Sequence, residues 1–438
     1  MRCEENERKL SLICDQVQLC MLPALKNNLD EVQLLPAQFE SYHTLLQQEL
    51  PRLYDLLQQN KEIFSNALNQ ELRAQLVLLL CELTASPTIY KLDAEAEYLL
   101  QNANQMLRKL MSICQNDEHS YIFNYYEQKL HKDSWKRQLG AVHGFVRYLE
   151  YYFTNDNKMS TKMLRFSLAM GLNVRECYHS DYKQLGIRVF SRMLSHSYAA
   201  DIQQLNIQGV IYENLLRDAY TMDSEEVTMS VWNCLCQCLD HFTELDSFTW
   251  NQCDDMLERL LHNVTLSSNA QLSICLLQFI TQLGYYFAIN RSEVKESLAN
   301  DFSQPDQLAA CREVCSSLNV ATNYRWAKGI LQMLVLESEK LLQGPDVCIQ
   351  MLNAMQRCYL VHIVPIPLPA LNAHLGKFFT KFVAVLLECL VVHDKTEPII
   401  QLTQQFIDIF IYQLNHSPAI NLKDFATALA SLQQVIVK

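Results

Sequence analysis

The helical apolar pattern of residues 181–222 is the feature that most limits what this chain can fold into. Its first stripe recurs at spacings of three and four residues and consists of Tyr182, Leu185, Val189 and Met193. Its second stripe repeats that spacing with Ile211, Leu215, Ala219 and Met222. The pattern predicts two helices joined by a short polar connector. Because two such helices bury only part of their apolar surface against each other, further helices must cover the rest.

Composition extends this prediction to the whole chain. Its 438 residues exceed the ~250 to 300 at which a single core stops growing, so we expect several domains or one elongated stack. Only 9 glycines and 11 prolines interrupt it, and it contains no Asn-Gly or Asp-Gly hairpin signal. We therefore expect an all-α protein, a HEAT/armadillo-like α-solenoid of stacked antiparallel helix pairs. About 18 helices are expected, close to the ~40 to 47 residues per pair in such arrays.

Polar and proline residues predict where individual helices begin and end. Pro51 suits the first turn of a helix, and residues 116–120 form a polar break. Either Asp133 or Ser134 can cap a helix that carries Trp135 on its apolar side.

The second half of the chain shows similar start signals. Ser224 begins one helix, and another follows Ser247. The last three helices are expected at about 372–392, 398–414 and 422–435.

These patterns suggest three regions along the chain. Residues 1–130 form N-terminal helical repeats and a cap, residues 131–290 form central repeats, and residues 291–438 form C-terminal repeats. The last region contains a proline-rich break at residues 364–369, where three alternating prolines predict an extended segment and a candidate hinge.

Charge and cysteine content indicate the class of partner and the compartment. The formal net charge of -12 disfavours nucleic acid and anionic membranes, because no cluster of Lys and Arg is available to neutralise phosphates. Protein partners are favoured instead. The charged N-terminus lacks a signal-peptide core, so the 16 cysteines are expected to be reduced in a cytoplasmic or nuclear protein. Residues 272–289 are uncharged, but their glutamines favour a buried helix over a membrane span.

The search for reactive chemistry yields little. Cys234, Cys238 and His241 fall on one helical face, which permits zinc, but buried cysteines acting as small hydrophobic residues are the favoured interpretation. No nucleophile elbow, phosphate-binding glycine loop or dinucleotide fingerprint occurs. We therefore predict no catalytic residue, no cofactor, no metal and no enzyme activity. Aromatic clusters at 121–126, 148–153 and 285–287 are interpreted as core more readily than as interface anchors.

Residues 130–262 resemble a known family. The matching motifs are SWK at 134–136, DY at 181–182, LG at 185–186, DIxxLN at 201–206, VIY at 210–212, YT at 220–221 and CDDML at 253–257. In this order they are similar to the central region of the Tel2-interacting-protein-two family, the third subunit of the Triple-T co-chaperone complex. The residues that carry the resemblance are Trp135, Asp181, Tyr182, Leu185, Gly186, Asp201, Leu205, Asn206, Tyr212, Leu215 and Tyr220. Most of them are expected to be structural, with Asp181, Asp201 and Asn206 as helix and turn caps.

The resemblance implies a non-enzymatic scaffold. Its expected partners are the other two Triple-T subunits, which are Tel2-like and Tel2-interacting-protein-one-like. Indirect partners would be the ninety-kilodalton heat-shock chaperone and phosphatidylinositol-3-kinase-related kinases, which act in TOR signalling and DNA-damage checkpoints and whose stability such a complex supports. The alternative is an unrelated helical-repeat adaptor, for example in trafficking or nuclear transport.

Overall fold

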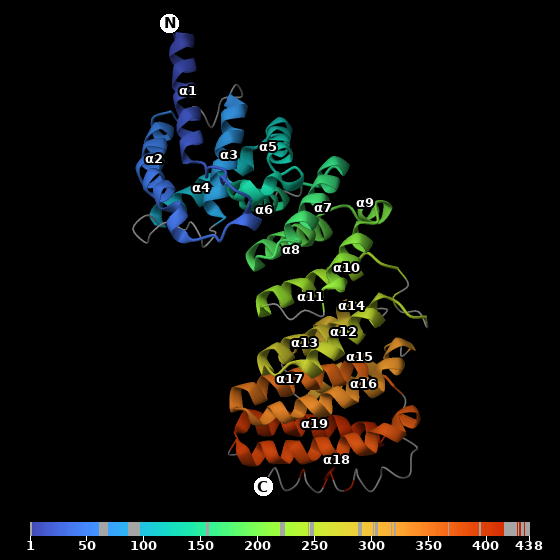
Figure 1. The fold of residues 1–438 in the computed structure, drawn as a ribbon. Coiled ribbons are helices and arrows are strands. Elements are labelled where there is room, and N and C mark those ends of the chain that lie inside the picture. Colours follow the sequence, from blue (N-terminus) through green and yellow to red (C-terminus); the bar gives the residue numbers. More distant parts are fainter. Residues whose placement is uncertain are drawn as a thin grey trace. The chain divides into compact units, whose positions relative to one another are not determined.

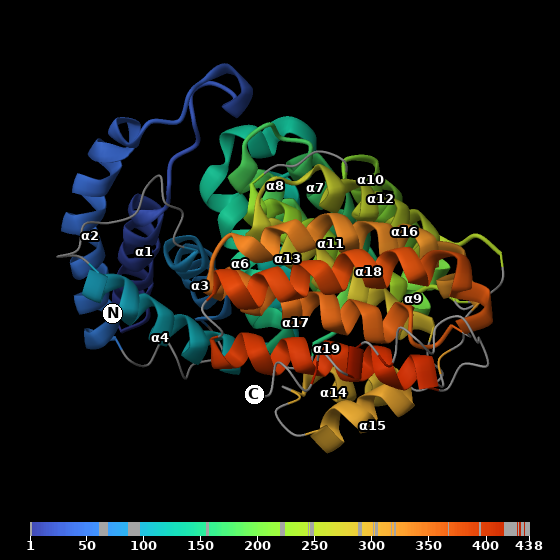
Figure 2. The same cartoon turned by 90° about the horizontal axis from the view of Figure 1, so that it is seen from below.

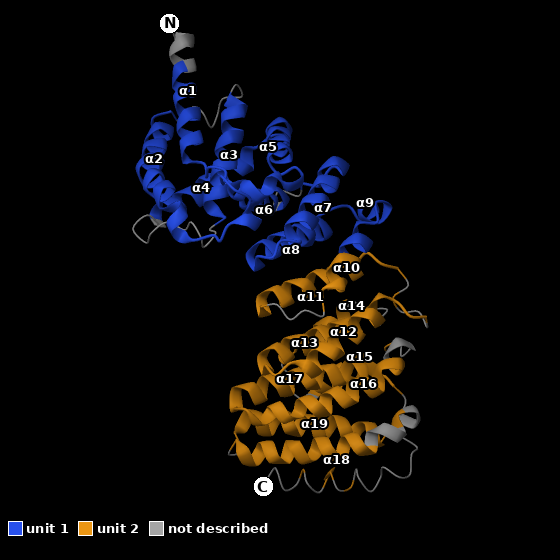
Figure 3. Cartoon of the chain, viewed as in Figure 1, with its two compact units in different colours: residues 1–211 blue, residues 212–438 orange. Residues whose placement is uncertain are grey.

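The fold is given by a computed structural model of the chain (Figure 1). It describes residues 2–60, 69–85, 97–154, 157–219, 224–243, 245, 249–287, 291–300, 302, 305–316, 318, 321–366, 368–393, 396–415, 427, 429–430 and 433. These residues form helices and connecting segments and contain no β-strand. By their contacts they separate into two compact units, residues 1–211 and 212–438 (Figure 3).

Unit 1 contains the first nine α-helices of the described chain. They are α1 Arg2–Cys20, α2 Glu40–Gln59, α3 Gln70–Thr84, α4 Glu97–Ile113, α5 Asn116–Lys129, α6 Leu139–Thr154, α7 Thr161–Arg175, α8 Ser180–His196 and α9 Ala199–Gln204. Three 3-10 helices join them, namely η1 Leu29–Glu31, η2 Pro36–Phe39 and η7 Lys132–Arg137.

Unit 2 contains the remaining α-helices of the described chain. They are α11 Glu225–Leu239, α12 Gln252–Leu266, α13 Ala270–Gly284, α14 Arg291–Ala299, α15 Pro305–Ser316, α16 Ala321–Glu337, α17 Pro345–His362, α18 Leu368–Val392 and α19 Glu397–Asn415. The 3-10 helices η8 Tyr285–Phe287 and η9 Ser338–Leu342 follow α13 and α16. Helix α10, Ile207–Arg217, contains the boundary between the units.

Helix α3 is the centre of unit 1. It packs against α1, α4, α5 and α6, so its leucines are buried on every side. Two charged residues are buried with them. The Arg73 guanidinium is paired to the Glu118 carboxylate of α5 at 2.6 Å, whereas the Glu82 carboxyl lies against α6 and accepts a hydrogen bond from the Leu22 amide at 3.3 Å. A helix whose side chains are buried all round must be enclosed by neighbours, as α3 is.

Helices α7 and α8 form the closest helix pair of unit 1 because glycines lie at their crossing. A Cβ added at Gly186 would lie 2.6 Å from the Gly171 carbonyl oxygen and 2.8 Å from the Arg175 amide nitrogen. A Cβ at Gly171 would meet the Phe190 ring at 2.6 Å. Glycine is therefore required at both positions for this close backbone approach.

Six helices of unit 2 form two rows. Helices α12, α16 and α18 pack side by side in one row, and α13, α17 and α19 do so in the other. Consecutive helices pair across the rows as α12 with α13, α16 with α17 and α18 with α19 (Figure 2). Because short connections separate the members of each pair, the pairs are antiparallel. This arrangement confirms the predicted all-α, HEAT-like α-solenoid.

The hairpin predicted within residues 181–222 is only partly right, because its two helices form as α8 and α10 but are not joined directly. Helix α8 pairs with the preceding helix α7 and also packs on α6, and the short helix α9 interrupts the predicted connector. Periodicity identified the buried face of α8 but carries no information on which helix covers it. Residues 220–223, which include Met222, lie outside the described residues.

Several predicted helix starts also need correction. Trp135 belongs to η7, and α6 begins only at Leu139. The predicted break at 116–120 is the first turn of α5, because Gln115 and Glu118 form a capping box there. Pro51 lies inside α2 rather than in its first turn.

The start signals in unit 2 were partly right. Ser224 caps α11 as predicted, accepting a hydrogen bond from the Val227 amide. Helix α12 is instead capped by Asn251, and Ser247 lies outside the described residues. The helix predicted at 422–435 falls almost wholly outside them too.

The proline-rich break was predicted to be extended, and the described part is not. Helix α17 ends at His362, and the next residues form a turn in which the Ile366 amide donates to the Ile363 carbonyl at 3.0 Å. Helix α18 then begins at Leu368, with Pro369 in its first turn, where a missing amide hydrogen costs nothing.

Candidate interaction surfaces

Four of the family-like residues of unit 1 lie in its core. Trp135 and Tyr182 are almost fully buried, with ring centroids 6.0 Å apart, and His143 lies 5.4 Å from the same tyrosine. Burial lowers the pKa of His143 to about 3, so its ring is neutral. Leu185 is buried beside Gly186 at the crossing of α7 and α8. These residues hold helices together and present no reactive group to solvent.

Two of the three predicted caps take other positions, and the third, Asn206, lies at a turn as predicted. Asp181 is exposed in the first turn of α8, whose N-cap is His179, and Asp201 lies within α9, whose N-cap is Tyr198. Asn206 lies between α9 and α10 with a left-handed φ of 50°. Asparagine tolerates that conformation better than most residues, so Asn206 is the turn residue of this connection.

The remaining motif residues are divided between burial and hydrogen bonding. In unit 2, the Tyr212 hydroxyl donates to the Gln252 carbonyl at 3.0 Å, and Leu215 is fully buried. Leu205 is half-buried in the described part of unit 1. Tyr220 lies outside the described residues.

Asp254, within the CDDML motif, is a polar junction that the sequence did not reveal. Its carboxylate is fully buried and accepts hydrogen bonds from Arg325 Nη1 at 2.6 Å and Trp326 Nε1 at 2.7 Å. It also accepts from the Asn251 amide at 3.0 Å, which completes a capping box. One carboxylate therefore caps α12 and fixes it to α16, its neighbour in the same row.

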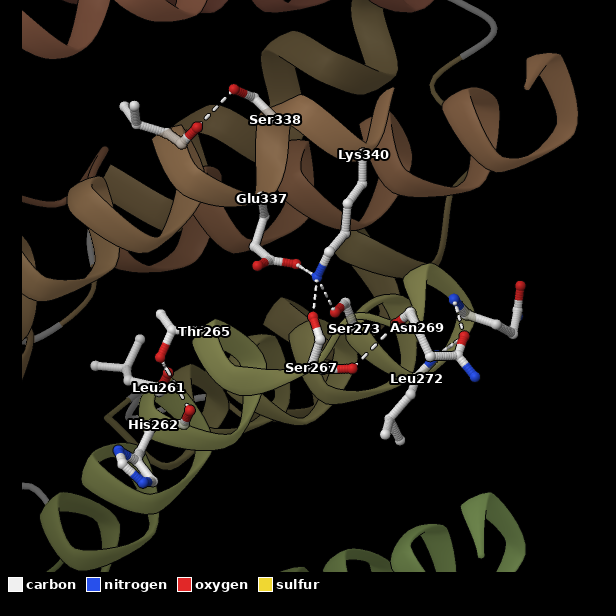
Figure 4. Close-up of polar contacts among 12 residues, drawn as sticks. Leu261, His262, Thr265, Ser267, Asn269, Leu272, Ser273, Glu337, Ser338 and Lys340 are labelled. Atoms are coloured by element: carbon white, nitrogen blue, oxygen red, sulfur yellow. Dashed lines mark hydrogen bonds and ion pairs between the residues drawn. The ribbon is translucent and has the colours of Figure 1, made fainter. Parts of the chain in front are cut away.

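A second polar junction joins η9 to the α12–α13 connection (Figure 4). Lys340 Nζ donates to the Ser267 carbonyl and to Ser273 Oγ, each at 2.7 Å, and is paired to the Glu337 carboxylate at 2.6 Å. Because the ammonium is mostly buried and donates three hydrogen bonds, it holds η9 against α12 and α13.

The described residues do not assemble a metal cluster. No group of three or more His, Cys, Asp or Glu side chains among them has the arrangement of a metal site. Cys234 and Cys238 are buried, and burial raises the pKa of the Cys238 thiol well above its ordinary value. A buried, protonated thiol behaves as a small hydrophobic group, which agrees with the favoured interpretation. Within the described part of the chain, no helix is long and apolar enough to cross a bilayer.

The aromatic clusters are largely core. Tyr126, Phe145 and Tyr148 are buried and in mutual ring contact, with centroids 5.3 and 5.9 Å from Tyr126. Tyr286 is buried and donates to the Cys236 carbonyl at 2.8 Å. The interpretation as core rather than interface therefore holds for these rings.

Two grooves remain on the surface of unit 2. The first, here called the glutamine groove, has a volume of about 510 Å³ and runs along the row of α13, α17 and α19. Its lining is mainly carboxamide and apolar, from Gln271, Ile274, Gln278, Ile349, Gln350, Asn353, Ala354, Arg357, Pro398, Gln401, Leu402 and Gln405. Arg357 donates to the carbonyls of Leu298 and Asn300, each at 2.7 Å.

The second groove, here called the lysine groove, has a volume of about 380 Å³ and lies between α16 and α18 of the other row. Its lining consists of Lys328, Leu331, Gln332, Val335, Leu336, Lys377, Phe378 and Lys381. Sequence reasoning missed both grooves, because each is assembled from helices far apart in the chain.

Comparison with known proteins adds no family. No protein-family model matches the chain, and no curated protein matches it either. Among solved structures, it is similar to a chain of the structure of Kap95p with RanGDP, with 13% identity, a TM-score of 0.39 and coverage of 89% of this chain and 52% of that chain. It is also similar to a chain of the Kap95:Nup1 complex, with 12% identity, a TM-score of 0.36 and coverage of 89% and 51%.

A third similarity is to a circular tandem repeat protein with novel repeat topology, with 13% identity, a TM-score of 0.24 and coverage of 98% of this chain and 96% of that chain. The chain spans about half the length of the two Kap95-associated chains. Identity this low concerns the fold alone, and the solenoid architecture rests on the helix packing described above.

Proposed function

We propose that this protein is a non-enzymatic scaffold subunit of a Triple-T-like co-chaperone complex. In this role it binds the Tel2-like and Tel2-interacting-protein-one-like subunits and, with the ninety-kilodalton heat-shock chaperone, supports the stability of phosphatidylinositol-3-kinase-related kinases. Its place of action would be the cytoplasm and the nucleus.

The observation that carries the proposal is the collinear set of motifs between residues 130 and 262. They resemble the Tel2-interacting-protein-two family in order as well as in identity. Several of them act at joints between helices, including Gly186 at the α7–α8 crossing and Asp254 between α12 and α16. Residues that set how neighbouring repeats pack would preserve the shape of a scaffold, which supports a shared architecture.

A scaffold works by presenting surface rather than by making or breaking bonds. The described titratable groups fit that role, because those with strongly shifted pKa values are buried in helix packing rather than gathered in a cleft. The exposed grooves of unit 2 are lined by amide, apolar and lysine side chains, which suit protein partners.

Affinity purification of the full chain with mass-spectrometric identification tests the proposal. Recovery of the Tel2-like and Tel2-interacting-protein-one-like subunits in comparable amounts is expected, and an unrelated acidic helical protein with the same tag is the control. Circular dichroism of the purified chain shows whether it is folded. A soluble, helical chain that recovers neither subunit would contradict the proposal. Recovery of trafficking or nuclear-transport proteins instead would favour the adaptor alternative.

A further inference from the structure

The lysine groove combines an apolar floor with a basic rim. Leu331 and Phe378 are buried at its base, Val335 is half-buried, and Leu336 is 56% exposed at its edge. The Phe378 ring stacks on Phe382 with centroids 5.2 Å apart, so the floor is held rigid from below. An apolar strip open to water on a rigid base is a surface that gains stability when it is covered.

The rim carries an uncompensated positive charge on an acidic chain. Lys328 extends from α16, and Lys377 and Lys381 extend one helical turn apart from α18. No ion pair among the described residues includes any of these three groove lysines. The carboxylate of Glu337 on α16 is instead paired to Lys340 at 2.6 Å. The net charge of the whole chain is -12, so this local excess is distinctive.

From this combination we infer that the lysine groove binds an amphipathic helix of a protein partner, with Leu or Phe residues on one face and Asp or Glu along its borders. The lining residues of α16 extend from Lys328 to Leu336, about 12 Å at 1.5 Å per residue. That length matches two turns of a partner helix, whose apolar side chains at i, i+3 and i+4 would contact the floor. Its carboxylates would then reach the three groove lysines.

The apolar floor distinguishes this partner from other anionic ligands. A free phosphate or a nucleic-acid backbone would neutralise the lysines but would leave Leu336 and Val335 exposed to water. An anionic membrane would need a flat or protruding surface, whereas these residues line a groove. The inference goes beyond the Triple-T proposal, because it concerns the chemistry of one groove and holds whichever complex the chain belongs to.

Fluorescence anisotropy of labelled peptides with the full chain tests the inference. Three peptides of about 20 residues, ~30 Å long as helices, serve as probes. One has a leucine stripe bordered by glutamates, the second has the same composition with the stripe scrambled, and the third has lysines in place of the glutamates. Only the first peptide should bind, and its affinity should fall as salt rises.

Two variants locate the binding site. Reversing the three groove lysines to glutamate should lower the affinity for the acidic striped peptide at least ~10-fold. Each rim ion pair contributes a factor of about 1.5 to 5 in affinity, and the reversal adds repulsion. The same variant should gain binding of the lysine-bordered peptide. Leu336→Asp should also lower the affinity for the acidic striped peptide. It should not unfold the chain, because the Leu336 side chain is already exposed. The control reverses three exposed charges outside the groove and comprises Lys26→Glu, Arg108→Glu and Lys295→Glu.

The inference is overturned by equal binding of the acidic striped peptide to the groove variant and to the control. Equal binding of the striped and scrambled peptides also overturns it, because the apolar floor would then play no part. The inference is also overturned if the peptide does not bind but phosphatidylserine vesicles or single-stranded RNA do, and if the groove variant loses that binding. The groove would then be a membrane site or a nucleic-acid site, respectively.

Discussion

Glu82 should make unit 1 less stable as the pH rises. Its carboxyl is 6% exposed and accepts one hydrogen bond, from the Leu22 amide at 3.3 Å. Gly140 and Gly144 of α6 lie directly against it, which leaves no room for water at that side. Burial therefore raises the pKa of Glu82 to about 8, while that hydrogen bond and the more distant charge of Lys129 lower it only in part.

The magnitude follows from the two pKa values. The folded state holds the proton up to a pH of about 8, whereas the unfolded chain releases it near the ordinary pKa of 4.5. The contribution of the Glu82 proton to the free energy of unfolding is therefore complete below pH 4.5 and is lost as the pH rises toward 8. At about 1.4 kcal/mol per pH unit, the free energy of unfolding falls by roughly 5 kcal/mol across that window. The Glu82→Gln variant has no proton to lose at this position. Its free energy of unfolding should therefore exceed that of the unmodified protein by about 3 to 5 kcal/mol at pH 8.

Urea unfolding between pH 5 and pH 8 measures this difference. Trp135 is the single tryptophan of residues 1–211, and its buried indole reports on unit 1. With a urea m-value of about 1 to 3 kcal/mol per molar, the midpoint of Glu82→Gln should exceed that of the unmodified protein by at least ~1 M at pH 8. The two midpoints should coincide near pH 5. Glu71→Gln removes an exposed carboxylate of the same helix and is the matched control. Parallel pH profiles for Glu82→Gln and the unmodified protein would refute the reasoning.

Five further substitutions test the packing. Gly186→Ala should destabilise unit 1 by about 1 to 3 kcal/mol, because its Cβ would meet backbone atoms of α7, whereas Gly376→Ala, with nothing within 4 Å, should stabilise α18 by about 0.5 to 1 kcal/mol. Equal effects of the two in thermal unfolding would disprove the close crossing. Leu215→Ala and Leu185→Ala should each lower the free energy of unfolding in urea by about 2 to 5 kcal/mol. Unchanged urea midpoints would show that these side chains are not part of the core. Asp254→Ala should lower the free energy of unfolding by about 1 to 3 kcal/mol, since it removes the acceptor of one Arg325 hydrogen bond and of the Trp326 Nε1 hydrogen bond. A loss no larger than that of an exposed aspartate such as Asp117 would contradict this role.

Local signals in the sequence were enough to predict the fold class and many helices. Ser224 is a side chain whose capping role depends on its own neighbours, and α11 begins where it predicts. The break expected at 116–120 failed for a similar local reason. Polar residues were interpreted as a loop, although Glu118 accepts a hydrogen bond from the Gln115 amide at 2.7 Å and so caps a helix there.

Pairing between helices was beyond the reach of periodicity. The stripe of α8 predicted correctly that Tyr182 and Leu185 are buried, but the helices that pack on α8, α6 and α7, precede it in the chain rather than follow it. The crossing is decided by Gly171 and Gly186, whose meaning appears only when the two helices are placed together. The turn after α17 shows the same limit, because proline restricts its own backbone and that of its predecessor without setting the direction of the chain.

The candidate surfaces depended still more on the three-dimensional arrangement. Lys328 lies about 50 residues from Lys377 and Lys381, and no spacing rule links them. They converge because α16 and α18 are neighbours in one row of unit 2. The Asp254 junction is similar, since its partners Arg325 and Trp326 lie more than 70 positions away. Such sites form where helices far apart in the chain become neighbours, and the sequence did not predict which helices are neighbours.

The enclosure of α3 has a consequence for the chain during its synthesis. Helix α3 ends at Thr84, but α4, α5 and α6, which cover three of its sides, are complete only at Thr154, about 70 residues later. At a translation rate of about 5 to 20 residues per second, the nascent chain carries this leucine-rich helix without those partners for roughly 4 to 14 seconds. During that interval only α1, among the helices that contact it, has already been made. A protein built this way presents a leucine-rich helix to the cell before it can bury it, and so is itself a candidate client for chaperones while it is being made.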